Sequence, residues 1–224
     1  MNKAGVLELI AGSALPEGIK TCLAGTAAMK ETSALKKALR KDPAGLLRGI
    51  GGLLVAAAGV LGLPGEAALF ITGFNANNRA PERFEAALAE LRAAVFLASL
   101  GFSGLELVAQ SGSRTADLSG RRGGLRCVFE VCRLRDDGSP AGIERLRSKY
   151  AKKIRQVKVS RKKYACGLGG LVLLDGPLGF GPLAPDPALL ALAARVSPAG
   201  NKAGGEHLCL IRGNGYAVWP PLGL

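Results

Sequence analysis

Two acidic residues, Asp117 and Glu130, have the types and the spacing that could support chemistry in this sequence. They lie on two strand-like segments, residues 117–118 and 126–133, which a glycine-rich turn over residues 120–124 separates. A hairpin of this kind can bring two carboxylates together at one end. Carboxylate oxygens are the ligands that Mg²⁺ and other hard cations prefer. The pair therefore predicts a site for a divalent metal.

The residue two positions after Glu130 is expected on the same strand face, because side chains alternate along a strand. A site that hydrolyses phosphodiesters with a metal would carry a lysine there, and this chain has Cys132. A neutral thiol supplies no positive charge to a phosphate. With Cys132 at this position, two interpretations are open: a working catalytic site or the remnant of one.

The elements that must position these acids follow a recognisable order. Apolar residues at helical spacing predict helices over residues 81–100 and 143–164, the second ended by Gly167, Gly169 and Gly170. Strands are expected at 105–109, 117–118, 126–133 and 171–174, followed by a loop at 177–187, a helix at 188–196 and a hairpin of 207–211 with 216–219. This order predicts an α/β sandwich with a mixed central sheet flanked by helices.

Residues 1–78 are rich in Ala and Gly and predict an N-terminal α-helical region with helices near 21–39, 43–61 and 66–72. Asp42 followed by Pro43 is typical of a helix start. The polar run at 75–79 indicates a linker, which divides the chain into a helical region, 1–78, and an α/β domain, 79–224. The N-terminal region could form a homodimer, bind a partner or contact DNA.

Several features in this order resemble the PD-(D/E)xK, or restriction-endonuclease-like, nuclease superfamily. Glu90, ahead of Leu100-Gly101-Phe102, stands where the family carries its first acid. Ala116-Asp117 stands in place of Pro-Asp, and residues 129–133 stand in place of the strand with Glu-x-Lys. Lys152 to Gln156, followed by the apolar residues 170–174, resembles the family's lysine/glutamine helix and next core strand.

The resemblance implies a restriction-endonuclease-like fold and a metal-dependent phosphodiester hydrolase. It implies that Glu90, Asp117 and Glu130 bind Mg²⁺ or Mn²⁺. It also implies that Lys152 and Gln156 assist on the side of the site where the substrate phosphate lies. Cys132 takes the position of the lysine that helps to activate the attacking water.

Three interpretations of Cys132 follow. Catalysis has been lost and a nucleic-acid-binding or structural module remains; or another cation substitutes, with Lys149, Lys152 and Lys153 as candidates; or the match is accidental. Arg133 is a further candidate cation, although it is expected on the opposite strand face from Glu130.

The second long helix carries most of the positive charge of the chain. Ten Lys/Arg and one acid lie between residues 139 and 165, which contributes +9 to a net charge of +13. Such a concentration predicts binding to a nucleic-acid backbone, with DNA as the expected partner. The predicted contact residues lie on this helix and on the preceding hairpin: Arg145, Lys149, Lys152, Lys153, Arg155, Lys158, Lys162, Lys163, Arg121 and Arg122.

Two further patterns bear on location. Residues 46–63, interrupted only by Arg48 and several glycines, and residues 67–73 are apolar, but each run is shorter than the roughly 20 residues of a membrane-spanning helix. A buried helical pair is the preferred interpretation, and a membrane-inserted hairpin over residues 46–73 is the alternative. Five scattered cysteines without a Cys-x-x-Cys pair, and no visible secretory signal, predict a cytoplasmic protein with reduced thiols.

Overall fold

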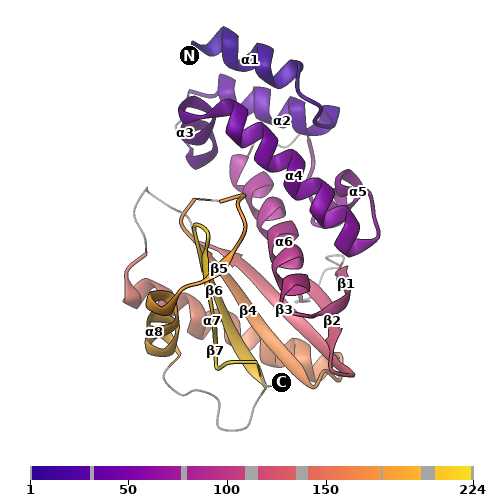
Figure 1. Ribbon diagram of the computed structural model, residues 1–224, viewed down its shortest axis with the longest axis vertical. Coiled ribbons are helices and arrows are strands. Elements are labelled where there is room, and N and C mark those ends of the chain that lie inside the picture. Colours follow the sequence, from indigo (N-terminus) through magenta and orange to yellow (C-terminus); the bar gives the residue numbers. More distant parts are fainter. Residues whose placement is uncertain are drawn as a thin grey trace.

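The structure is a computed structural model that describes residues 2–30, 33–76, 80–108, 116–134, 141–177, 179–197 and 205–222. Two parts are stacked end to end, an N-terminal group of helices above an α/β part (Figure 1). The helical group comprises α1 (Lys3–Ala11), α2 (Glu17–Ala28), α3 (Ala34–Lys41), α4 (Pro43–Leu61) and α5 (Gly65–Ile71).

The α/β part is built on a mixed seven-stranded sheet in the order β1-β2-β3-β4-β6-β7-β5. Its strands are β1 (Ser103–Leu107), β2 (Leu118–Arg122), β3 (Leu125–Arg133), β4 (Leu168–Asp175), β5 (Ala184–Pro185), β6 (Glu206–Arg212) and β7 (Gly215–Trp219). The first three strands are antiparallel, whereas β3, β4 and β6 run parallel. A mixed sheet flanked by helices was predicted from the element order, and this prediction is confirmed.

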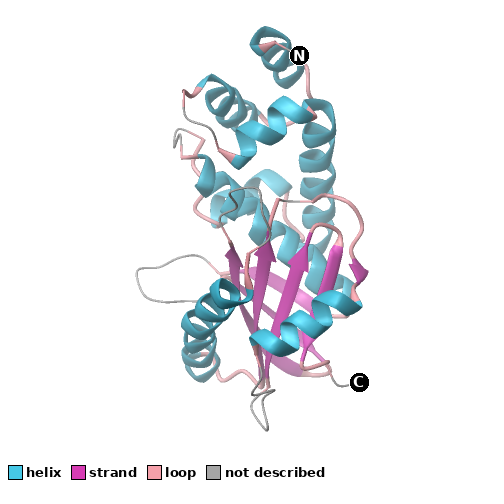
Figure 2. Ribbon diagram, turned by 90° about the vertical axis from the view of Figure 1, so that its left-hand side faces the viewer, coloured by secondary structure: helices cyan, strands magenta, loops and turns pink. Residues whose placement is uncertain are grey.

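Helices cover the sheet on both faces (Figure 2). On one face, α6 (Pro81–Ser99) packs through Phe96 and Leu97 against Phe129 and Val172. On the other face, α7 (Ile143–Lys163) and α8 (Pro187–Val196) pack against alternate residues of the same strands, such as Leu171. Side chains alternate between the two faces along each strand, so neighbouring residues of one strand pack against different helices. α7 links the parallel strands β3 and β4 across one face.

One helix joins the two parts of the molecule. The N-terminal half of α6 contributes Phe84, Leu88 and Leu91 to the core of the helical group. Its C-terminal half contributes Phe96 and Leu97 to the core beneath the sheet. The predicted boundary near residue 78 therefore precedes a helix whose apolar side chains fill two cores. Of the predicted linker, residues 77–79 lie outside the described residues.

Capping residues decide where the N-terminal helices begin. Asp42 caps α4 by accepting a hydrogen bond from Gly45 N, as the sequence predicted. The single helix predicted over 21–39 is wrong, because α2 ends at Ala28 and α3 begins at Ala34. Ser33 accepts a hydrogen bond from Lys36 N at the start of α3, and such a side-chain cap favours a new helix over continuation of the old one.

The turn between β2 and β3 is tighter than predicted. Gly120, Arg121 and Arg122 belong to β2, and only Gly123 and Gly124 form the turn. Both turn glycines have positive φ, 54° and 80°, as the two central residues of a type I′ hairpin turn require.

Glycines after α7 also differ from their predicted role. Gly169 and Gly170 lie inside β4 and do not end the helix. A Cβ at Gly169 would lie 2.5 Å from Cδ of Arg161, so the absence of a side chain lets α7 approach the strand closely. Residues 136–140, whose Asp, Gly, Ser and Pro content predicts a turn, lie outside the described residues.

Candidate active site

Asp117 is held rigidly by the backbone of the strands beside it. It precedes β2, and its backbone N–H donates to Phe129 O at 3.0 Å. Its carbonyl accepts from Val108 N at 3.0 Å, and its carboxylate Oδ2 accepts from Val131 N at 2.6 Å. The pairing of Leu118 with Phe129, continued by one residue, sets Asp117 opposite Glu130. The hairpin therefore brings the two acids to the same sheet face, as their sequence positions predicted.

Glu130 lies in the middle of β3, with only 3% of its surface exposed. Its Oε2 receives a hydrogen bond and ion pair from Nζ of Lys153, at 3.2 Å, from the helix that covers this face. Burial and the charge of Asp117 raise the pKa of the Glu130 carboxyl, and the Lys153 ammonium opposes that shift. Burial likewise raises the pKa of Asp117, against the Val131 N–H and Lys153.

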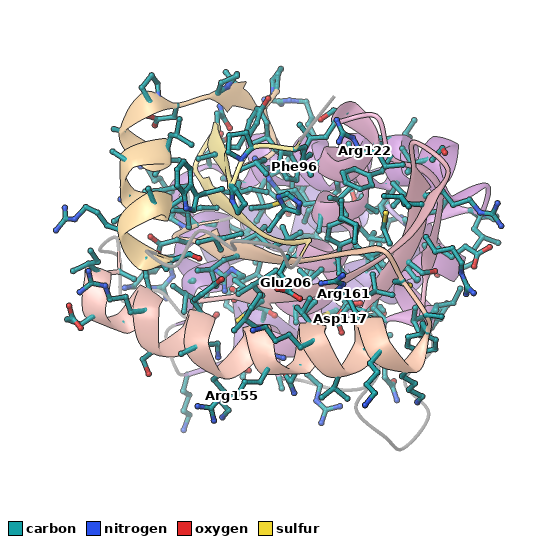
Figure 3. All side chains as sticks on the ribbon, turned by 90° about the horizontal axis from the view of Figure 1, so that it is seen from below. Phe96, Asp117, Arg122, Arg155, Arg161 and Glu206 are labelled. Carbon is teal, nitrogen blue, oxygen red and sulfur yellow. The ribbon has the colours of Figure 1, made fainter. Side chains whose placement is uncertain are left out.

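Glu90 reaches the same cluster from α6. Burial, followed by the charges of Asp117 and Glu130, raises the pKa of Glu90 to about 9. Lys153 is the group that lowers it. Three carboxyl groups from a helix, a strand and the residue before a strand therefore interact around one ammonium. Figure 3 shows Asp117 between the sheet and α7.

The donors of this cluster suit a hard divalent cation, since all three are carboxyl groups, and a bound cation would favour their ionised form against the raised pKa values. Their placement is not that of a finished metal site. Within the described residues, no group of three His, Cys, Asp or Glu side chains is arranged to hold a metal ion. The Lys153–Glu130 ion pair accounts for one carboxylate, so metal binding would require these side chains to rearrange. Metal binding by Glu90, Asp117 and Glu130 stays a prediction.

Cys132 lies on the same face of β3 as Glu130 and is buried, with 6% exposed. It packs in the layer that contains Leu146 and Leu173. Burial raises the pKa of its thiol, while Lys149 and Lys153 lower it. The thiol is therefore a packing residue within reach of two ammonium groups, and the positive charge beside the acids comes from α7.

The side of α7 that faces the carboxylates carries Lys153, one residue away from the predicted Lys152. Lys153 and the fully buried Val157 are four residues apart and share a helix face. Lys152 and Gln156 line a hollow on the other side, together with Arg155, which points away from the sheet in Figure 3. The structure therefore does not bring Lys152 to the acids. The sequence predicted Lys153 only as one of three candidate substitute cations, because the apolar spacing over residues 143–164 does not distinguish it from Lys149 and Lys152.

Many of the predicted nucleic-acid-binding residues of α7 are exposed to solvent. The exposed members of the predicted set on this helix are Arg145, Lys152, Arg155, Lys158, Lys162 and Lys163. Two other basic residues of α7 have structural partners: Arg147 pairs with Glu144, and Arg161 pairs with Glu206 of β6 (Figure 3). The helix therefore uses part of its charge in ion pairs within the fold and exposes these six residues to solvent.

The two hairpin arginines of the predicted set differ. Arg121 is exposed. Arg122 donates to Leu100 O at 3.3 Å, and its guanidinium lies 5.6 Å from the ring centroid of Phe102. Arg122 thus fastens the hairpin to the end of α6. Arg133, the other candidate cation, pairs with the buried Glu85 of α6, on the opposite sheet face from Glu130.

α4 bears on the membrane alternative. It is long and apolar enough to cross a membrane by length and composition, a test that core helices of soluble proteins also pass. It buries Ile50, Leu53 and Leu54 against the other N-terminal helices and exposes 75% of Val55. One such helix does not distinguish a membrane span from a core helix.

Comparison of the chain with known protein families, with curated proteins and with solved structures finds no match.

Proposed function

We propose that the protein is a metal-dependent nuclease of the restriction-endonuclease-like type that acts on DNA. The order α6, β1, β2, β3, α7, β4, with parallel pairing between β3 and β4, supports this proposal because it agrees with the order of motifs in that superfamily. The charges of Asp117 and Glu130 raise the pKa of Glu90, so the three acids act on one another electrostatically. The exposed basic surface of α7 lies on the same side of the sheet as the acids.

The observation that carries the proposal is the 3.2 Å contact between Lys153 Nζ and Glu130 Oε2. A nuclease of this type needs a cation beside its metal-binding carboxylates to stabilise charge that develops on the phosphate. Cys132 does not provide one. Lys153 enters from α7 into the same space, so the required charge is present although the strand does not carry it.

Each residue has a distinct role in this proposal. Glu90, Asp117 and Glu130 would hold Mg²⁺ or Mn²⁺, which would neutralise phosphate charge and lower the pKa of a bound water. Asp117 is oriented by Val131 N–H, so its carboxylate is set before any substrate arrives. Lys153 would leave Glu130 and turn its ammonium to the scissile phosphate. The exposed lysines and arginines of α7 would contact the backbone of the DNA.

The test compares neighbouring lysines in a cleavage assay. Purified protein with Mg²⁺ or Mn²⁺ is expected to cut DNA, and Asp117→Asn should abolish cutting. Lys153→Met should lower the rate about 100-fold or more, the usual effect of removing one transition-state donor. Lys152→Met removes the same charge from the outer side of the helix and should leave the catalytic rate unchanged while weakening DNA binding. Equal rates for the two lysine variants would contradict the role of Lys153.

A non-catalytic nucleic-acid-binding protein of the same fold is the second candidate. The buried thiol of Cys132 and the incomplete placement of three metal ligands favour it. It predicts salt-sensitive DNA binding with no cleavage in Mg²⁺ or Mn²⁺. Cleavage that Asp117→Asn removes would exclude it, and absence of binding at low salt would exclude both candidates.

A further inference from the structure

We propose that a groove between β1, β2, β3 and the C-terminal end of α7 binds one nucleotide of a single strand next to the carboxylate cluster. This inference rests on the proposed function and names the form of its substrate. The groove has a volume of about 260 Å³. The residues that carry the argument are Glu106, Ser119, Arg121, Arg126, Val128 and Tyr164, all of which line it.

The groove lies on the same sheet face as the acids, further along β2 and β3. Ser119 lies two residues after Asp117, and Val128 lies two residues before Glu130. Ser119 and Val128 are partners in the β2–β3 register, and both line the groove. Side chains two apart along a strand share a face about 7 Å from one another. A strand of nucleic acid at the carboxylates would therefore enter the groove with its adjoining nucleotide.

Two arginines stand opposite each other at the far end of this path. Arg121 and Arg126 are register partners, four residues from Asp117 and Glu130 respectively, and both are exposed. Like charges directly opposite in an antiparallel pair destabilise the sheet. Neither arginine forms an ion pair with a carboxylate of the described residues. A phosphate between the two guanidinium groups would reduce the repulsion, and its oxygens would accept hydrogen bonds from their N–H groups.

An aromatic ring and an acid complete the groove. Tyr164, at the C-cap of α7, lines it and has Lys163 Nζ 5.4 Å from its ring centroid. An aromatic ring beside a phosphate site is the arrangement on which a base can stack. Among the described lining residues Glu106 is the only acid, and a carboxylate accepts hydrogen bonds from the ring N–H or amino groups of bases. Together these residues offer contacts to the phosphate and to the base of a nucleotide.

The size of the groove decides between one strand and two. Pockets for small molecules measure roughly 300–1,000 Å³. At about 260 Å³ this groove lies just below that range, so it has room for one nucleotide and not for two paired strands within it. The inferred substrate is therefore single-stranded nucleic acid or an unpaired end, with the outer surface of α7 available to contact a flanking duplex.

The test measures binding of the full-length protein in EDTA by fluorescence anisotropy. The probes are labelled hexathymidylate and a 20-base-pair duplex. Arg121→Gln with Arg126→Gln is expected to weaken hexathymidylate binding at least tenfold and duplex binding less than about threefold. Tyr164→Leu is expected to weaken hexathymidylate binding about tenfold. Arg121→Lys with Arg126→Lys keeps the charge and loses the forked geometry, so a smaller loss is expected.

The matched control is Lys152→Gln with Arg155→Gln, which removes two positive charges from the outer side of α7. It should weaken duplex binding more than hexathymidylate binding, the reverse of the groove variant. Equal losses for both probes in both double variants would mean that only net charge matters, and would overturn the inference. Failure of the unmodified protein to bind hexathymidylate would overturn it as well. Circular dichroism of each variant establishes that it is folded, and the Arg→Lys pair replaces any Arg→Gln variant that is not.

These outcomes separate the inference from the proposed function. Groove-dependent binding of hexathymidylate without cleavage in Mg²⁺ or Mn²⁺ would support the nucleotide site and contradict the nuclease. Cleavage that Asp117→Asn removes, combined with unchanged hexathymidylate binding in the groove variants, would support the nuclease and overturn the nucleotide site.

Discussion

At the scale of single residues, the position of one ammonium group decides what the acids can do. Lys153 contacts Glu130 from a helix, while Cys132 occupies the strand position where the nuclease pattern has lysine. The two positions face the same space, since Lys153 lowers the pKa of the Cys132 thiol. A lysine on the strand and a lysine on the helix are therefore alternative sources of one charge.

This equivalence predicts a rescue. Lys153→Met should lower the rate of cleavage about 100-fold or more, and adding Cys132→Lys to that variant should restore at least part of the rate, because the ammonium returns to the same space from β3. Cys132→Lys alone brings a second cation into a buried layer and should lower the midpoint of urea unfolding. Rates of plasmid cleavage for the single and double variants check the prediction. As a control, Cys209→Lys in the Lys153→Met background places the charge in the core on the other sheet face and should restore nothing.

The raised pKa of Glu90 makes stability depend on pH. Its pKa rises from 4.5 to about 9 on folding. Between these values the folded chain holds a proton that the unfolded chain has released, so this residue lowers the free energy of unfolding as pH increases. Glu90→Gln removes the effect. In EDTA, its urea midpoint should exceed that of the unmodified protein at pH 8, and the difference should shrink towards pH 5.

Glu8→Gln, on the exposed side of α1, is the matched control and should leave the midpoint unchanged at both pH values. A difference between Glu90→Gln and the unmodified protein that stays constant from pH 5 to pH 8 would contradict the raised pKa. Addition of Mg²⁺ at pH 8 should stabilise the unmodified protein more than Glu90→Gln, since a bound cation favours the ionised carboxyl.

At the scale of elements, α7 shows how one helix serves two purposes. Its inner side supplies Leu146, Lys153 and Val157, and its outer side carries the exposed Lys152 and Arg155. The helix ends at a strained residue. Ala165 has a φ of 49°, and the hydrogen bond from Cys166 N to Arg161 O closes the last turn around it. This is a left-handed C-cap, in which glycine is the favoured residue.

Ala165→Gly should therefore stabilise the protein by about 1 kcal/mol, because an L-residue pays for the left-handed conformation and glycine does not. The same substitution at Ala151, exposed in the middle of α7, should destabilise it by about 1 kcal/mol through loss of helix propensity. Urea unfolding of both variants measures the difference. Changes of the same sign at the two positions would contradict the assigned helix end.

At the scale of the whole molecule, the helical group and the α/β part are connected through α6. Besides the two cores that this helix fills, Glu85 of α6 pairs with Arg133 of β3, and the backbone of Leu35 in α3 lowers the pKa of the same carboxyl against the effect of its burial. The start of α3 and the end of the strand that carries Glu130 therefore both act on Glu85. The N-terminal region is thus part of the framework that orients the acids.

Removal of residues 1–78 should consequently leave a fragment that does not fold stably, because Phe84, Leu88 and Leu91 would lose the core that buries them. Circular dichroism and urea unfolding of residues 79–224 should show little native structure, whereas the full chain should unfold in a single transition. Within the full chain, Leu88→Ala should cost about 2–5 kcal/mol. A monomeric, cooperatively folding fragment of residues 79–224 would contradict this dependence.

The sequence by itself determined the local elements and the identity of the acids. Helical spacing located α6 and α7, alternation located β3, and Asp42-Pro43 located the start of α4, because each signal lies within one element. The hairpin also set Asp117 opposite Glu130, since short antiparallel connections leave little freedom. The start of α3 at Ser33 was missed because its cap lies within a pattern that also suits a continuous helix.

Only the tertiary structure decided which lysine faces the acids. Lys152 and Lys153 are adjacent, and a rotation of 100° per residue sends them to different surroundings. That rotation is set by the packing of Leu146 and Val157 on the sheet and by the close approach at Gly169. The same is true of α6, because its apolar residues have the same helical spacing whether they fill one core or two. Contacts between elements distant in the chain have no local signal. The sequence therefore could not predict which ammonium lies beside Glu130, or that α6 belongs to both cores.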